Sequence, residues 1–351
     1  MRHFAFAIPG DLDRLTGGYG YDRRVIAECR AVGIDVEHLA LAGDFPAPSA
    51  TSLDAAAAAF ARVAPEVPIL VDGLAFAVLP ETLISRARRR FVALVHHPLA
   101  LETGLAAEMA ARLELSERAA LGQADAVVAT STTTARSLVA DYGVDPIRLS
   151  VAEPGIDPVS RAVGSARDPQ ILAVGSVVPR KAYPVLVEAL AAIADLPWKC
   201  RIVGATDADT AEPARVRGRI AAHGLASRVD LVGTLAGARL EAAFASADLF
   251  VHPAYHEGYG MALAEALAHG VPIVASNAGA IPETVPSAAG LLVPPGEADA
   301  LAAALRAVLT DSVRRRAMAD AAWAAAKTLP RWSATARTIV AALQLALRSQ
   351  S

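Results

Sequence analysis

The chain has 351 residues, of which 54% are hydrophobic and 20% charged, and its formal net charge is −3. This length predicts about two domains, each large enough to bury its own core. A chain so close to neutrality lacks the overall basic field of a nucleic-acid-binding protein, so no nucleic acid partner is expected. Cys29 and Cys200 have no metal-binding spacing and are expected to be buried free thiols.

The apolar segments of the chain are short. The opening residues, MRHFAFAIPGDLD, contain too few apolar side chains in a row for a secretory signal. No stretch reaches the 18 uninterrupted apolar residues of a membrane span. A soluble, cytoplasmic protein is therefore expected.

In the first half, short apolar runs alternate with longer stretches of helical period. Strands are predicted at residues 3–8, 35–41, 69–72, 91–96, 125–129 and 147–152, and helices between them at 22–31, 54–63 and 105–122. This alternation is the signature of a parallel sheet with helices on both faces. The strands are apolar throughout, as strands buried on both faces should be.

A connector rich in Pro and Gly, EPGIDPVSRAVGSARDP, separates this half from a second alternation. Strands are predicted at 171–174, 201–203, 229–232, 249–252, 272–275 and 291–293, and helices at 184–194, 213–222, 239–245, 261–269, 299–309, 312–327 and 333–348. The pattern predicts an α/β protein with two Rossmann-like domains, and ligands at the carboxyl ends of the strands, in a cleft between them.

Two motifs of the first half could meet a ligand. The sequence GGYG at residues 17–20 precedes a helix, where tandem glycines let backbone amides approach an anion. It differs from the G-x-G-x-x-G of nicotinamide sites, and a loop without a ligand is the alternative. His96 and His97 end the fourth strand, and neighbouring strand residues point to opposite faces. One of the two is expected to face the ligand, with a structural histidine as the alternative.

The second half begins with a strand, Gly175, and the adjacent cations Arg180 and Lys181, before a helix that opens near Pro184. An Arg fork and a Lys point charge at this place form a sensible grip for a diphosphate. The alternative is a solvated charge pair.

The strongest segment is HEGYGMALAEALAHGVPIVAS, which contains Glu257 and Glu265 in an E-x7-E spacing. Glu257 is expected in the loop before the helix. Glycines on either side of Tyr259 leave the backbone open, so the amides of residues 259–261 can point at a phosphate. A pair of hydrolytic carboxylates is the less favoured interpretation.

Two further loops are weaker signals. Residues 277–283, NAGAIPE, follow a predicted strand and form another strand-end loop. Asp207 and Asp209 resemble a D-x-D metal motif, but no other metal ligand stands near them, so we do not interpret them as a metal site.

From Gly175 to about Val293, an ordered set of segments resembles the retaining, nucleotide-sugar-dependent glycosyltransferases of family four (group 1). The segments are GSVVPRKAYPVLVEAL, RIVGA, VDLVGTL, ADLFVHPAYHEGYGMALAEALAHGVPIVAS, AGAIPETV and GLLVPPG. The first half is similar more loosely, through GGYG, HHP, ADAVVATS and AEPGID, where Pro154 stands in place of the common Asn. The resemblance implies the GT-B fold, with two Rossmann-like domains whose parallel sheets face each other across a cleft.

The resemblance also implies domain limits and a reaction. Residues 1–160 would form the acceptor-side domain and 165–328 the nucleotide-sugar domain, while 330–351 would cross back to the first domain. The enzyme would transfer a hexosyl group from a nucleoside diphosphate sugar to a hydroxyl acceptor: a glycan, a lipid or a small molecule. UDP-sugars are favoured and GDP-mannose comes next, without metal or cofactor. The alternatives are a catalytically inactive nucleotide-sugar-binding protein and a phosphorylase-like enzyme of the same fold.

The resemblance assigns roles to individual residues. Arg180 and Lys181 would neutralise the diphosphate, Glu257 would contact the transferred sugar, and His96, or else His97, would touch the sugar or its developing charge. Glu265 would bind the ribose hydroxyls. The other donor contacts would be Gly17, Gly18, Gly204, Thr234, Gly258, Tyr259, Gly260 and Met261.

A cluster of arginines in ISRARRRF invites a membrane interpretation. Arg86, Arg88, Arg89 and Arg90 could touch anionic lipid headgroups, each contributing roughly 1 kcal/mol. That would place the protein at the inner face of a membrane as a peripheral protein. A solvated helix end before a buried strand is the alternative.

Overall fold

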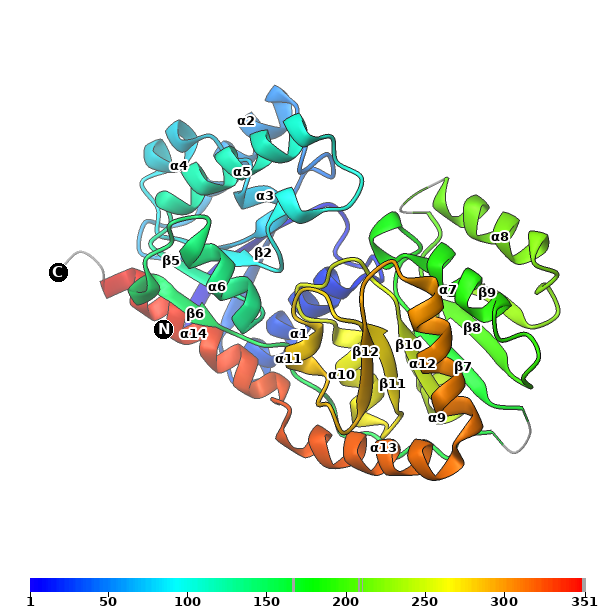
Figure 1. The fold of residues 1–351 in the computed structure, drawn as a ribbon. Coiled ribbons are helices and arrows are strands. Elements are labelled where there is room, and N and C mark those ends of the chain that lie inside the picture. The colour runs from blue at the N-terminus through cyan, green and yellow to red at the C-terminus, as the bar shows by residue number, and fades with distance from the viewer. Residues whose placement is uncertain (166–167, 208, 210, 349–351) are drawn as a thin grey trace. The chain divides into compact units, whose positions relative to one another are not determined.

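A computed structural model describes residues 1–165, 168–207, 209 and 211–348. Its contacts divide the chain into two compact units (Figure 1). The N-terminal unit comprises Met1–Arg14, Gly18–Gly155 and the chain from Pro330 onward, and the C-terminal unit comprises Leu15–Gly17 and Ile156–Leu329. The domain limits expected from the sequence are not tested by this division and stay predictions.

The N-terminal unit is built on a six-stranded sheet in the order β2-β1-β3-β4-β5-β6, in which every pairing is parallel. The strands are β1 (His3–Pro9), β2 (Asp35–Leu41), β3 (Ile69–Asp72), β4 (Phe91–Val95), β5 (Ala126–Ala129) and β6 (Leu149–Val151). The predicted parallel sheet is confirmed.

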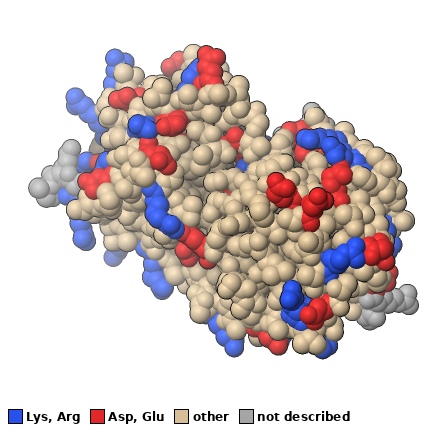
Figure 2. Space-filling view, in the orientation of Figure 1, with Lys and Arg blue, Asp and Glu red and all other residues tan. Residues whose placement is uncertain are grey.

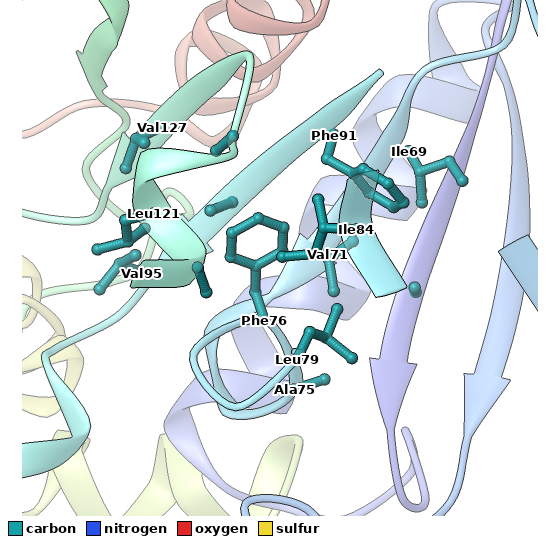
Figure 3. Packing of buried hydrophobic residues seen from close by; sticks show 14 of the residues in the cluster. Ile69, Val71, Ala75, Phe76, Leu79, Ile84, Phe91, Val95, Leu121 and Val127 are labelled. Carbon is teal, nitrogen blue, oxygen red and sulfur yellow. The ribbon is translucent and has the colours of Figure 1, made fainter. Parts of the chain in front are cut away.

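Helices connect these strands and cover the sheet. They are α1 (Gly17–Ala31), α2 (Ala50–Arg62), α3 (Gly73–Phe76), α4 (Glu81–Ala87), α5 (Ala107–Gly122), α6 (Thr132–Ala140) and α14 (Trp332–Arg348), with 3-10 turns η1 (Leu99–Leu101) and η2 (Pro146–Arg148). Figure 3 shows how Phe76 of α3 and Ile84 of α4 lie beside Phe91 of β4. The rings of Phe76 and Phe91 are 6.3 Å apart. Burying such large apolar side chains is the main force that holds helix to sheet.

The C-terminal unit repeats the architecture with the strand order β12-β11-β10-β7-β8-β9, again with every pairing parallel. The strands are β7 (Gln170–Val174), β8 (Lys199–Val203), β9 (Val229–Gly233), β10 (Leu249–His252), β11 (Ile273–Ser276) and β12 (Gly290–Val293). The helices are α7 (Tyr183–Ala191), α8 (Glu212–Ala222), α9 (Ala238–Ala245), α10 (Met261–Ala268), α11 (Ile281–Thr284), α12 (Ala298–Thr310) and α13 (Ser312–Ala325), with 3-10 turns η3 (Pro179–Lys181) and η4 (Ala326–Thr328).

The expectation of strands buried on both faces holds in the centre of the sheets and fails at their edges. The central strands β3, β4 and β10 are buried at every residue. The edge strand β2 instead alternates between buried and exposed positions, and the first residues of β8 do the same. Edge and near-edge strands have less cover, so one of their faces meets water. Among the described helices, none combines the length and apolarity needed to cross a membrane.

The C-terminal helix α14 belongs to the N-terminal unit. It contacts β4, β5 and β6, and the hydroxyl of Thr335 donates to the carbonyl of Glu153 over 2.6 Å. The Trp332 ring meets the Tyr21 ring edge-on at 5.7 Å. Gly155 makes the closest approach, because a Cβ built there would lie 2.1 Å from the nitrogen of Trp332. Only a glycine lets the two backbones meet in this way.

Gly155→Ala should therefore lower the free energy of unfolding by about 3 kcal/mol or more, since neither backbone can yield easily. We expect the melting temperature to fall by several degrees. Gly122→Ala in α5 is the matched control, because nothing lies within 4 Å of its added Cβ. It should raise stability slightly, since alanine favours helix. Equal melting of the two variants would contradict this packing.

Candidate functional site

Two adjacent cations follow the first strand of the C-terminal unit. Strand β7 ends before Gly175, and η3 carries Arg180 and Lys181 directly before α7. Gly175 has φ 155°, and a Cβ there would lie 3.0 Å from Lys181 Cε. The glycine thus leaves room for the lysine stem to fold over the end of the strand. Both cations are mostly shielded from water, with side chains 15% and 13% exposed.

The cations meet at Glu257. Its Oε1 lies 3.3 Å from Arg180 Nη1 and forms a close ion pair with Lys181 Nζ. Arg180 Nη1 also donates to the carbonyl of His256 over 2.9 Å. Burial raises the pKa of Glu257, but Lys181, His252 and Arg180 outweigh it and hold that pKa well below its ordinary value. Glu257 is therefore a buried carboxylate that stays ionised.

The sequence interpretation missed His252, the last residue of β10. Its Nε2 lies 3.0 Å from Glu257 Oε1, and only 2% of the residue is exposed. Burial, followed by the charge of Lys181, lowers the pKa of His252. A polar residue that closes an apolar predicted strand was the signal that could have found it.

The loop after Glu257 presents an open backbone at the start of α10. Gly260 has φ 90°, and Met261 is the first residue of the helix. Gly258 and Tyr259 are buried, and the Tyr259 carbonyl accepts a hydrogen bond from the Thr284 hydroxyl over 2.8 Å. The early amides of a helix have no partner within it, so this end favours an anion. Glu257 lies in the loop, as expected from the sequence.

The predicted strand-end loop at residues 277–283 packs against this segment. Gly279 has φ 55°, and a Cβ there would lie 2.2 Å from the Glu257 carbonyl oxygen. The amide of Ala280 donates to the same oxygen over 2.9 Å. The loop therefore fixes the backbone that carries Glu257.

Glu265 stands in a different electrostatic environment. It lies on α10 and is partly buried. Burial raises its pKa to about 7, and the carboxylates of Glu241 and Asp157 raise it further. The two glutamates of the E-x7-E segment are thus distinct: one is held ionised by cations, and the other has neighbours that oppose its charge.

Gly204, one of the predicted donor contacts, lies where two strand ends come together. A Cβ on Gly204 would lie 1.8 Å from the Gly175 carbonyl oxygen, and its amide donates to the Gly233 carbonyl over 2.9 Å. Thr234 follows β9 and is exposed. The structure therefore brings Gly204 beside the segment that begins the cation loop. Gly17 is assigned to this unit too, where its added Cβ would lie 4.0 Å from Met261 Sδ.

A second cluster lies in the N-terminal unit around His96. Its Nε2 is 3.3 Å from Asp72 Oδ2 and 3.5 Å from Asp22 Oδ1. A Cβ on Gly18 would lie 3.7 Å from the same ring. Residues 17–20 form the first turn of α1. The prediction that they precede the helix is therefore wrong. The glycine amides still lie at a helix N-terminus, where the first amides lack partners within the helix.

The cluster around His96 combines opposite charges with donor atoms that lie close together. Burial lowers the pKa of His96, but Asp22 and Asp72 outweigh it and raise the pKa to about 10. The three donor atoms lie within 4.8 Å of one another, close enough to hold an ion. Without an ion, the imidazole lies within ion-pair distance of both carboxyl groups. The absence of a resident metal remains a prediction.

Several other residues that the sequence analysis considered make contacts within their own unit. His97 Nε2 lies 3.4 Å from Glu102 Oε2, so the two histidines have separate partners. Asp209 Oδ1 accepts from the amides of Ala211 and Glu212, each over 2.8 Å, where the chain enters α8. Residue 208 of the D-x-D segment lies outside the described residues. Cys29 and Cys200 are buried free thiols, one in each unit.

Two of the four clustered arginines hold the N-terminal unit together. Arg89 Nε donates to the Val63 carbonyl over 2.8 Å, and Arg90 Nη1 pairs with Asp125 at 2.9 Å. Arg86 and Arg88 are exposed. On the face drawn in Figure 2, Lys and Arg side chains are interspersed with Asp and Glu.

Comparison with known proteins decides the family. A family model described as glycosyl transferases group 1 matches residues 159–324, and one described as glycosyltransferase family 4 matches residues 68–159. The chain belongs to the group 1, family 4 glycosyltransferases. This confirms the resemblance based on the ordered segments from Gly175 to about Val293.

Individual relatives match different lengths of this chain. D-inositol 3-phosphate glycosyltransferase of Rhodococcus jostii is 32% identical over 184 residues, 48% of this chain and 40% of the relative. The chain therefore spans about two fifths of the length of such curated relatives. Sucrose-phosphate synthase from Thermosynechococcus elongatus has a TM-score of 0.82 at 23% identity, covering 96% of this chain and 98% of that one. HepE of Anabaena in complex with UDP-glucose has a TM-score of 0.78 at 20% identity, covering 97% and 100%. The predicted GT-B fold is confirmed.

Proposed function

We propose that the chain is a glycosyltransferase that takes a hexosyl group from a nucleoside diphosphate sugar held by its C-terminal unit. The observation that carries this is the convergence of Arg180, Lys181 and Glu257 beside the open N-terminus of α10. Two cations and the first amides of a helix suit a diphosphate. The relatives add support: the Rhodococcus protein is named a glycosyltransferase, and HepE was solved with UDP-glucose.

The donor would be arranged along the carboxyl ends of the strands. Arg180 and Lys181 would meet the diphosphate, with the amides of residues 259–261. Glu265 would accept hydrogen bonds from the ribose hydroxyls. Gly204 and Thr234 would lie near the base, and Glu257 would contact sugar hydroxyls. The roles that the resemblance gives to Gly17, Gly18, Gly258 and His96 remain predictions.

The chemistry follows from where charge develops. Breaking the bond between the anomeric carbon and the phosphate oxygen leaves an oxocarbenium-like sugar and an anionic diphosphate. Preorganised cations and helix amides stabilise that leaving charge more in the transition state than in the ground state. The cations would do the work of a metal ion.

Retention of configuration is the expected outcome. Glu257 is held by two cations, which makes it a weak nucleophile toward the anomeric carbon. We therefore propose front-face transfer, in which the acceptor oxygen bonds to the anomeric carbon while its proton passes to the departing phosphate oxygen. UDP-sugars are the favoured donors, then GDP-mannose, and the acceptor is a hydroxyl of a glycan, a lipid or a small molecule.

The proposal is tested by incubating the protein with UDP-glucose or GDP-mannose, a panel of hydroxyl acceptors, and either EDTA or Mg²⁺. Expected results are release of one nucleoside diphosphate, equal rates with and without EDTA, and a product whose anomeric proton coupling matches that of the donor. Inverted product or a strict need for Mg²⁺ would overturn the mechanism. A nucleotide-binding protein that transfers no sugar would point to the inactive alternative.

Membrane contact through the arginine cluster should be weak. Arg89 and Arg90 are occupied by partners of their own unit, which leaves Arg86 and Arg88. Two exposed arginines contribute about 2 kcal/mol at an anionic surface, too little for stable binding. We expect the protein not to float with vesicles containing phosphatidylglycerol at physiological salt. Co-flotation that Arg86→Ala with Arg88→Ala abolishes would restore the membrane interpretation.

A further inference from the structure

The buried imidazole of His252 has no role in the donor contacts described so far. It closes β10 in the C-terminal unit, with its ring stacked near that of Phe250 at 6.1 Å. Its Nε2 points at Glu257 Oε1 over 3.0 Å. Buried polar groups are normally hydrogen-bonded, and Glu257 is the partner of this ring nitrogen.

Glu257 Oε1 takes three contacts at once. Lys181 and Arg180 approach it as cations, and His252 approaches it through Nε2. Only 6% of Glu257 is exposed, so its charge depends on these groups. Removing partners from a buried charge is costly, because water does not replace them.

Under the proposed function, Glu257 and the donor diphosphate compete for the same two cations. The same two cations would have to serve both Glu257 and the diphosphate. As Lys181 and Arg180 turn toward the phosphates, Glu257 loses much of the attraction that keeps it ionised. A buried carboxylate with too few donors takes up a proton instead.

We propose that His252 is a positioning residue that donates its Nε2–H to Glu257 and keeps this carboxylate ionised and in place while the two cations engage the diphosphate. This inference rests on the proposed function. It explains why a neutral donor joins the two cations at Glu257 Oε1: it can hold Glu257 without competing for the phosphates.

The protonation states around Glu257 agree with this role. Burial and Lys181 lower the pKa of His252, so its ring is neutral near pH 7 and carries one N–H. Burial and the charge of Glu257 raise the pKa of Tyr183, which stays protonated. The Tyr183 hydroxyl donates to the Gly175 carbonyl over 2.9 Å. The groups that face Glu257 are thus two cations and a neutral imidazole, with a neutral phenol nearby.

The test measures proton uptake when the protein binds UDP, or GDP if UDP does not bind. Titration calorimetry at pH 7 in two buffers of different ionisation enthalpy gives the number of protons taken up. His252→Leu removes the donor, whereas His252→Gln places an amide N–H near the position of Nε2. Phe250→Leu is the matched control, because it disturbs the packing of the same ring and leaves the donor in place.

We expect His252→Leu to take up a fraction of a proton on binding that wild type does not. Its affinity for the nucleotide should fall as pH rises from 6 to 8, and its donor KM should rise about tenfold or more. His252→Gln should restore the wild-type proton count, and Phe250→Leu should lose stability without altering that count. Wild-type proton uptake and KM in His252→Leu, or no rescue by His252→Gln, would overturn the inference.

A second measurement covers the case in which His252→Leu does not fold. Nitrogen-15 NMR of the wild-type histidines, with and without UDP, reports the tautomer of His252. We expect a neutral ring protonated at Nε2 in both states, and an imidazolium or a ring protonated only at Nδ1 would overturn the inference. Failure of wild type to bind any nucleoside diphosphate would instead sink the proposed function, and this inference with it.

Discussion

Lys181→Ala and Arg180→Ala should each lower kcat/KM by about 100- to 1000-fold, the usual cost of removing one group that stabilises developing negative charge. Each removes a cation that we assign to the leaving diphosphate. Lys199→Ala is the matched control. Lys199 lies on β8 of the same unit, is exposed, and donates to the Ser227 carbonyl over 2.6 Å. It should leave turnover unchanged.

The lysine variant also has a structural cost, which the experiment can separate. Lys181→Ala leaves Glu257 with fewer partners, and breaking a buried ion pair costs about 3–5 kcal/mol. Adding Glu257→Gln to Lys181→Ala should recover much of the lost melting temperature but none of the lost activity. Unchanged turnover in both single cation variants would refute the diphosphate assignment.

Glu265→Gln should weaken binding of the cognate nucleoside diphosphate by about 10- to 100-fold, the worth of hydrogen bonds to a charged group. The loss should be specific to the ribose. Wild type should bind the 2′,3′-dideoxy nucleotide poorly, whereas Glu265→Gln should bind the two nucleotides about equally. Asp195→Asn, an exposed carboxylate paired with Arg306 at 2.6 Å, is the control and should bind both as wild type does. Normal binding by Glu265→Ala would remove the ribose role.

The same carboxylate gives a pH signature. Burial raises the pKa of Glu265 to about 7, followed by the charges of Glu241 and Asp157. The ionised form accepts hydroxyl protons, so wild-type affinity should rise as pH increases through 7, and Glu265→Gln should show no such rise. In the unliganded protein the stability of the fold depends on pH in the opposite direction to the affinity. The folded pKa lies above the unfolded value, so the stabilisation from the bound proton is present below about pH 4.5 and is lost as pH rises through 7.

Much of the fold was readable from the sequence because central parallel strands are continuously apolar. Strand β10 (Leu249–His252) and strand β2 (Asp35–Leu41) match their predicted limits. The helices α3, α4 and α6 were not predicted. Helix α3 has only four residues, started by the Asp72 cap over its second residue, and α6 begins with three threonines, which are poor helix formers. Neither shows a helical period long enough to detect.

The site was readable where its chemistry lies along the chain and hidden where it depends on the sheet. The cation pair and the Glu257 loop stand in short motifs. The contact of Asp72 with His96 depends on β3 and β4 lying side by side, and that of His252 with Glu257 depends on how the loop after β10 folds back on the strand end. Asp72 and His252 both end predicted strands, and the carboxyl ends of parallel strands gather at one edge. Polar residues at those positions were the available signal.

The central claim is that the C-terminal unit is a nucleoside diphosphate sugar site built on Arg180, Lys181, Glu257 and Glu265. The most direct measurement is a thermal-shift panel of UDP, GDP, ADP, CMP and NAD on wild type and Lys181→Ala. A ligand at 100 times its Kd adds about 2.7 kcal/mol, which moves the melting temperature by a few degrees. We predict a shift with one nucleoside diphosphate in wild type and none in Lys181→Ala. A shift with NAD alone, or with no nucleotide at all, would contradict the account.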